Sequence, residues 1–140
     1  MAFKVMLDAN VCLDFLLRRQ EYPISKQLFQ KVFDREVSAF ITPTIFHIIA
    51  YFLSKYYSKE DAKNILLNFL LDVDAMEADH EIMINALTSS MSDIEDALQY
   101  YTAIHHKVDY FLTYDKDFQK ASLPILPVIS PGSFLGLYYN

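Results

Sequence analysis

The feature that most constrains the fold is a regular alternation between short apolar runs and longer segments whose apolar residues recur at helical spacing. The runs predicted to be strands cover 3–7, 37–41, 72–76, 109–113 and 125–128. Strands that alternate with helices predict a parallel sheet whose right-handed crossovers place helices on both faces. The sequence therefore predicts an α/β fold, a three-layer α/β/α sandwich around a parallel sheet of about five strands.

Several polar residues mark where helices begin, because their side chains can accept hydrogen bonds from the free N–H groups of a first turn. Asn10 is expected to cap the first helix, Ser58 a later one, and Asp79 another. The helix from Ile45 to about Lys55 is apolar almost all round, so we expect it to be buried. Pro127 cannot donate a ladder hydrogen bond, which predicts an edge position for the last strand.

Composition indicates a single domain over residues 1–140, long enough to bury a real core. Gly132 and Gly136 are the only glycines, which excludes a glycine-rich phosphate loop. Cys12 is the only cysteine, which excludes an internal disulfide and a thiolate metal cage. The sequence shows no signal peptide and no long apolar run, so we expect a cytoplasmic protein with no membrane partner.

Charge is unevenly distributed around a net value of −6. Residues 1–63 carry nine Lys and Arg against seven Asp and Glu, whereas residues 64–140 carry three against eleven. A protein that holds nucleic acid mainly through phosphate contacts shows a strong basic footprint. This distribution argues against tight, sequence-independent binding of nucleic acid without help from a metal ion or a partner.

Three acidic residues are associated with predicted strand ends. Asp8 follows the first strand, Asp115 follows the strand at 109–113, and Asp96 lies in the helix that leads into that strand. Ligands of open α/β sheets bind at the carboxyl ends of the strands. Acids that converge there without basic neighbours repel one another unless a divalent cation joins them, which points to metal-assisted phosphoryl chemistry.

Hard oxygen ligands of this kind suit Mg²⁺ or Mn²⁺. We expect Asp8, Asp96 and Asp115 to be the ligands, with Asn10 and Thr113 fixing their rotamers by hydrogen bonds. Glu95 or Asp93 is the alternative to Asp96. Asp117 is the alternative to Asp115, and one of these two is expected to cap the next short helix. We expect Asp14 to be a solvated helix residue.

Three segments resemble the motifs of PIN domains, in the same order and at similar spacing. They are VMLDANV at 5–11, DIEDALQ at 93–99 followed by Ala103, and FLTYDKDF at 111–118. The resemblance covers nearly the whole chain and is nearest to the PIN-domain ribonuclease toxins of bacterial toxin–antitoxin pairs. It implies a metal-dependent endoribonuclease that acts on an RNA substrate, is inhibited by a small antitoxin protein, and forms a homodimer. Basic residues that could guide the RNA phosphate are Arg18, Arg19, Lys55 and Lys116.

One position departs from that family pattern. Similar toxins usually place a glutamate in the helix after the second strand, and His47 most nearly matches it here. A neutral imidazole supplies less negative charge for Mg²⁺, although it can bind Mn²⁺. The alternative is that His47 is a buried, hydrogen-bonded histidine of the core.

Two other functions compete with the nuclease. The first is a catalytically weakened PIN-like module that binds RNA or protein, which His47 and the weak basic footprint favour. The second is a phosphatase or phosphotransferase that uses Asp8 as a nucleophile. Asn10 stands where a second acid would be expected for that chemistry, which argues against it.

Overall fold

A five-stranded parallel sheet forms the centre of the computed structural model, which describes residues 2–139. The strands lie side by side in the order β3-β2-β1-β4-β5, and every pair is parallel. Their bounds are β1 Phe3–Leu7, β2 Val37–Ile41, β3 Val73–Ala75, β4 Tyr110–Leu112 and β5 Val128–Ile129. The predicted parallel sheet is thus confirmed. Its last strand lies at an edge as expected, but begins after Pro127.

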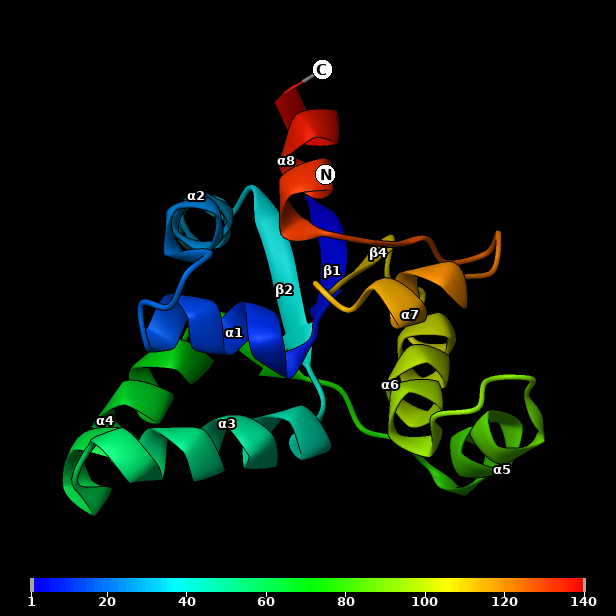
Figure 1. The fold of residues 1–140 in the computed structure, drawn as a ribbon, viewed down its shortest axis with the longest axis horizontal. Coiled ribbons are helices and arrows are strands. Elements are labelled where there is room, and N and C mark those ends of the chain that lie inside the picture. Colours follow the sequence, from blue (N-terminus) through cyan, green and yellow to red (C-terminus); the bar gives the residue numbers. More distant parts are fainter. Residues whose placement is uncertain (1, 140) are drawn as a thin grey trace.

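Helices cover both faces of the sheet (Figure 1). Helices α1 to α4 lie on one side of it and α5 to α7 on the other, while α8 lies near the chain's N-terminus. The bounds are α1 Ala9–Leu16, α2 Tyr22–Phe33, α3 Pro43–Tyr56, α4 Lys59–Leu70, α5 His80–Thr88, α6 Ile94–His105, α7 Lys116–Lys120 and α8 Pro131–Tyr139. The arrangement confirms the α/β/α sandwich. None of the described helices is long and apolar enough to cross a membrane.

The central strand β1 contributes to a separate core on each face of the sheet. Val5 and Leu7 belong to the core shared with α1 to α4, whereas Met6 belongs to the core that contains Tyr100 and Phe118. Successive side chains of a strand point to opposite faces. Because both faces are covered, the strand reads in the sequence as a continuous apolar run.

Of the three caps expected from the sequence, Ser58 and Asp79 are confirmed and Asn10 is not. Ser58, Asp79 and Asp93 each accept a hydrogen bond from a first-turn N–H, as capping residues do. At α1 the cap is Asp8, whose Oδ1 accepts from the N–H of Ala9 at 2.8 Å. The prediction that Asn10 is the cap is wrong, because the helix begins at Ala9 and Asn10 lies within its first turn.

Helix α3 is amphipathic rather than buried all round. Ile45, Ile49 and Leu53 are buried, but Tyr51 is 56% exposed. The expectation of a fully buried helix is wrong because only one side of α3 packs on the core, and its outer side carries aromatic residues that hydropathy counts as apolar.

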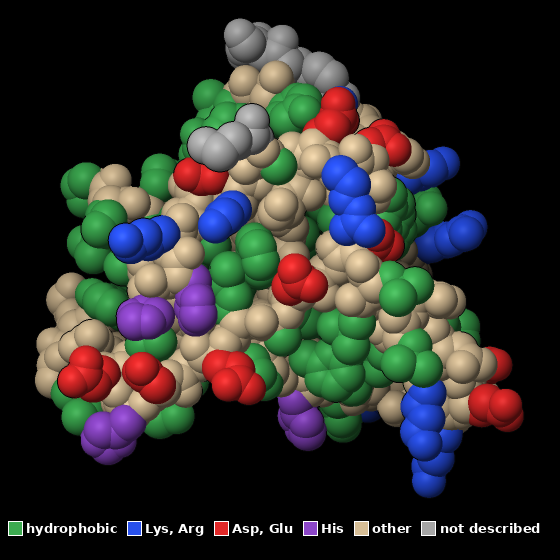
Figure 2. Space-filling model, turned by 180° about the vertical axis from the view of Figure 1, so that it is seen from behind, with side chains coloured by type: hydrophobic (Ala, Val, Ile, Leu, Met, Phe, Trp, Pro, Cys, Tyr) green, Lys and Arg blue, Asp and Glu red, His purple; other side chains and the backbone are tan. Residues whose placement is uncertain are grey.

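Lys and Arg side chains do not gather in one patch on the face of the molecule shown in Figure 2. They are distributed over several separate places, and histidine and acidic side chains lie close together in the region of α5 and α6. This agrees with the excess of acidic residues in the second half of the sequence.

A buried hydroxyl connects helices on opposite faces of the sheet. Thr42 Oγ1 accepts from the N–H of Ile45 at 3.1 Å and donates to Gln99 Oε1.

Thr42→Val should lower the free energy of unfolding by about 1–3 kcal/mol, because it removes the cap of α3 and leaves the Gln99 oxygen unpaired. Urea unfolding is the measurement, with Thr44→Val, an exposed threonine of the first turn, as the control. Equal losses in the two variants would contradict the bond between α3 and α6.

Candidate functional site

The carboxyl ends of β1 and β4 lie side by side at the edge of the sheet where the flanking helices change from one face to the other. These strands are neighbours, with Leu7 paired to Leu112. After β1 the chain enters α1 on one face, whereas α6 and α7, which flank β4 in sequence, lie on the other (Figure 1). Such a reversal is the position at which open α/β sheets bind ligands.

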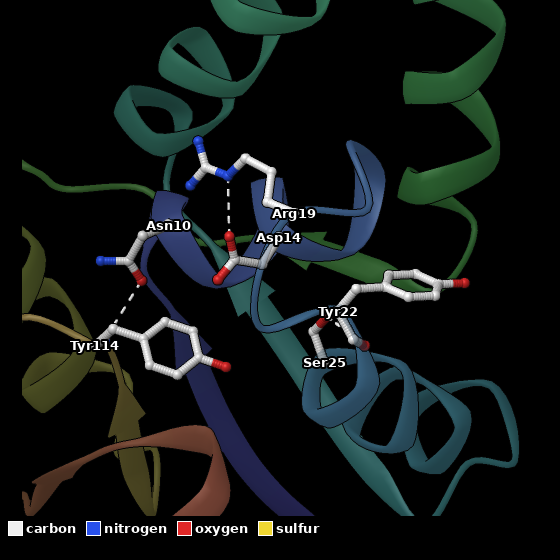
Figure 3. Close-up of polar contacts among 6 residues, drawn as sticks. All are labelled: Asn10, Asp14, Arg19, Tyr22, Ser25 and Tyr114. Carbon is white, nitrogen blue, oxygen red and sulfur yellow. Dashed lines mark hydrogen bonds and ion pairs between the residues drawn. The ribbon is translucent and has the colours of Figure 1, made fainter.

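Asp8 follows β1 at this edge of the sheet, and both of its carboxylate oxygens accept hydrogen bonds. Oδ1 accepts from the N–H of Ala9 at 2.8 Å, and Oδ2 accepts from Thr113 Oγ1 at 2.7 Å. Asn10 supports the arrangement, because its Nδ2 donates to Thr113 Oγ1 at 3.3 Å and its Oδ1 accepts from the N–H of Tyr114 at 3.4 Å (Figure 3). Thr113 is fully buried. The structure therefore places Asn10 and Thr113 where they fix the Asp8 carboxylate.

Asp115 follows β4 and caps α7. Its Oδ1 accepts from the N–H groups of Asp117 at 2.9 Å and Phe118 at 3.2 Å, and its own N–H donates to Thr113 Oγ1 at 3.1 Å. Of the two acids at this turn, Asp115 is therefore the cap, and Asp117 lies exposed in the first turn of α7. Within the described chain Asp115 Oδ2 makes no hydrogen bond, so this oxygen stays available to a ligand.

A pocket of about 230 Å³ lies between the starts of α6 and α7, and four carboxylates line it. They are Asp93, Asp96, Asp115 and Asp117. Asp93 caps α6 by accepting from the N–H of Asp96 at 2.9 Å. The structure thus brings Asp96 and Asp115 to one pocket, and it adds Asp93, which the motif alone ranked below Asp96.

Electrostatic repulsion connects these carboxylates with Asp8. Burial, and after it the negative charges of Asp93, Asp8, Asp115 and Glu95, together raise the pKa of Asp96 to about 7. Burial also raises the pKa of Asp8, which the hydrogen bonds from Thr113 and Ala9 oppose, while Asp115 and Asp93 add to the increase. Every charge that shifts these two groups is negative, so among residues 2–139 no cation compensates them.

This donor set fits a hydrated Mg²⁺ or Mn²⁺ ion better than an ion enclosed by protein ligands. Among residues 2–139 no three His, Cys, Asp or Glu side chains lie together as a ready-made metal-binding group. Mg²⁺ usually keeps several waters and needs only one or two carboxylates from the protein. The carboxylates that would hold it are Asp8, Asp96 and Asp115, whose mutual repulsion a cation would relieve.

His47 lies on the outer side of α3. It is exposed, and it stands about 200° around the helix from the buried Ile45. The alternative that it is a buried core histidine is therefore wrong. No hydrogen bond or ion pair joins His47 to another described residue, and it is not among the charges that shift Asp8 or Asp96.

Asp14 was expected to be a solvated helix residue, and this expectation is wrong. It is only 7% exposed, and its Oδ1 accepts from Arg19 Nε at 2.9 Å (Figure 3). Arg19 stands beyond the end of α1, where the chain turns back through Arg18. Only the turn brings the two charges together, which explains why helical spacing did not reveal the pair.

The fold and the carboxylate cluster define an α/β protein with an acidic site at the point where its sheet topology reverses. Residues 4–117 match a family model described as PIN domain, and the chain belongs to this family. The motifs quoted from the sequence are therefore confirmed as a family resemblance.

Solved structures of similar fold include toxins of toxin–antitoxin systems. VapBC2 from Rickettsia felis, bound to a DNA fragment from its promoter, has a TM-score of 0.65 and 18% identity, covering 90% of this chain and 97% of that one. A toxin–antitoxin complex from Klebsiella pneumoniae has a TM-score of 0.68 and 18% identity, covering 91% and 97%. Mycobacterium tuberculosis VapC20, described as a toxin that cleaves the sarcin–ricin loop, has a TM-score of 0.67 and 10% identity, covering 88% and 98%. No curated protein sequence matches the chain.

Removal of the Thr113 hydroxyl should raise the pKa of Asp8 further, because the hydrogen bond from Thr113 favours the ionised carboxylate. Thr113→Val is the test, and a carbon-detected NMR titration of the Asp8 carboxyl group is the measurement. Thr102→Val is the control, since Thr102 is equally buried but donates to Leu98 within α6. An unchanged Asp8 titration in Thr113→Val would show that the bond does not form.

Stability should fall as pH rises from about 4 to 7, because folded Asp96 keeps a proton there that the unfolded chain has released. Asp96→Asn should flatten this part of the dependence of Tm on pH. Asp61→Asn, an exposed acid in the first turn of α4, is the control. Parallel pH profiles for wild type and Asp96→Asn would contradict the raised pKa.

Proposed function

We propose that this chain is a metal-dependent endoribonuclease and the toxin of a toxin–antitoxin pair. The observation that carries the proposal is the cluster of Asp8, Asp96 and Asp115, whose carboxylates form no ion pair with any residue in the described part of the chain. Membership of the PIN-domain family supports it, because nucleases of this family generally use divalent metal ions. The likeness to toxins, one of them described as cleaving the sarcin–ricin loop, supports RNA as the substrate.

When bound, Mg²⁺ or Mn²⁺ neutralises phosphate charge and lowers the pKa of a water that attacks phosphorus. The protein contributes orientation. Thr113 and Asn10 hold Asp8 in one rotamer, and the use of Asp115 Oδ1 as the cap of α7 leaves Oδ2 for the ion. Burial and the neighbouring acids raise the pKa of Asp96 to about 7, so Asp96 would have to lose its proton in order to hold the ion.

An antitoxin protein is the partner that the structural relatives suggest. The neighbours from Rickettsia felis and Klebsiella pneumoniae are toxin–antitoxin assemblies. We therefore include a cognate antitoxin and a homodimer in the proposed function.

Asp8→Asn should lower RNA cleavage by about 100-fold or more, because it removes a charge placed for the transition state and keeps the shape of the side chain. A fluorescently labelled single-stranded RNA in Mg²⁺ or Mn²⁺ measures this under single-turnover conditions. Asp34→Asn, an exposed acid at the far end of α2, is the control. Wild-type rates in Asp8→Asn would remove Asp8 from the mechanism.

A second candidate is a PIN domain that binds RNA or protein with weakened catalysis. His47 at the usually acidic position supports it, as does the lack of a ready-made three-residue metal group among residues 2–139. Purified protein in Mn²⁺ would then bind RNA or a partner without turnover. If the alignment of His47 holds, His47→Glu would tighten Mg²⁺ binding in calorimetry, and an unchanged affinity would separate position 47 from the metal site.

A further inference from the structure

A second pocket, of about 470 Å³, adjoins the acidic site on the α1 side. Its lining consists of Asn10, Asp14, Arg19, Gln20, Glu21 and Tyr114. Asn10 also bonds to Thr113, the residue that holds Asp8, so one lining residue of this pocket belongs to the hydrogen-bond network of the Asp8 carboxylate. Figure 3 shows Asp14 and Arg19 on one side of this region, with Asn10 and Tyr114 on the other.

Arg19 forms a fixed wall of the pocket. Its Nε donates to the buried Asp14 carboxylate at 2.9 Å, and its backbone N–H donates to the Asp14 carbonyl at 3.0 Å. The turn between them passes through Arg18, whose φ of 50° lies in the left-handed region that ends helices. The backbone bond places the residue and the Nε bond orients its guanidinium plane, while the side chain stays 42% exposed. A fixed and partly exposed guanidinium plane is a surface on which an unstacked RNA base can lie.

The charge of the lining argues against a phosphate as occupant. The negative charge of Asp14 cancels the positive charge of Arg19, so the charge of Glu21 makes the lining negative overall. The Glu21 carboxylate accepts no capping hydrogen bond from α2, and no ion pair joins it to another described residue. A free carboxylate accepts hydrogen bonds and repels an anion, so it selects a neutral group that presents N–H donors.

Tyr114, which lines the side of the pocket opposite Arg19, carries an unused polar group. Its hydroxyl is buried and makes no hydrogen bond with any described residue. Buried polar groups are normally paired, so this hydroxyl favours a ligand that brings a partner to it.

We propose that this pocket, defined by Arg19, Glu21 and Tyr114, binds one unstacked guanine base of the RNA beside the cleavage site. Guanine stacks on the Arg19 plane and donates two neighbouring N–H groups of its Watson–Crick edge to the Glu21 carboxylate. Uracil presents one such donor between two carbonyl oxygens, which the carboxylate repels. The assignment rests on the proposed ribonuclease function and names its base preference.

The test compares binding of labelled 12-nucleotide oligouridylates that carry guanosine, inosine, adenosine or uridine at one central position. Fluorescence anisotropy of the full chain in EDTA measures affinity without cleavage. Wild type should bind the guanosine oligonucleotide about 10-fold more tightly than the all-uridine one, with inosine between them because it lacks the amino group. Glu21→Gln should remove most of this preference, whereas Glu60→Gln, an exposed glutamate of α4, should keep it.

Arg19→Lys separates stacking from base reading. Lysine keeps the charge opposite Asp14 but lacks the guanidinium plane, so affinity for all four oligonucleotides should fall by about 10-fold with the guanosine preference unchanged. Thermal unfolding of each variant verifies the fold.

The outcomes distinguish the base pocket from the proposed function. If wild type cleaves RNA but shows no guanosine preference, or if Glu21→Gln keeps that preference, the base pocket is overturned and the nuclease stands. If wild type neither binds nor cleaves RNA in Mg²⁺ or Mn²⁺, the proposed function falls and the base pocket with it.

Discussion

The hydrogen bond from Thr113 Oγ1 to Asp8 Oδ2 joins the ends of the two strands on which the candidate site is built. The same hydroxyl accepts from Asn10 and from the N–H of Asp115, so one buried atom connects β1, α1 and the start of α7. A buried hydroxyl with these partners is fully satisfied, and its position is well determined. The geometry of the acidic cluster therefore depends on the pairing of β1 with β4.

Three of the clustered carboxylates also begin helices. Asp8 caps α1, Asp93 caps α6, and Asp115 caps α7. The positive ends of helix dipoles stabilise nearby negative charge, which helps a site that has no cationic side chain among the groups that shift its pKa values. The helix dipoles offset only part of the repulsion between these carboxylates, because the pKa of Asp96 is still raised to about 7.

Local signals account for what the sequence predicted well. Strand β2 has the predicted bounds, and Ser58 and Asp79 cap helices as expected, because each depends on residues close together in the chain. One error is local, because Asp8 and not Asn10 caps α1. The other differences concern tertiary packing. The outward side of α3, the burial of Asp14 against Arg19, and the place of Asp93 in the pocket arise from contacts between elements that spacing alone does not encode.

The use of caps as candidate ligands has a consequence for how this chain can diverge. Asparagine caps a helix about as well as aspartate, since the amide oxygen accepts the same N–H hydrogen bond. A single exchange of oxygen for nitrogen at Asp8 Oδ2 would therefore remove charge from the site and leave the helix start in place, although the new N–H group could no longer accept the hydrogen bond from Thr113. In a fold built this way, one substitution can convert a charged site into a neutral one, so related chains can keep the helix start while they lose the negative charge that would hold a cation.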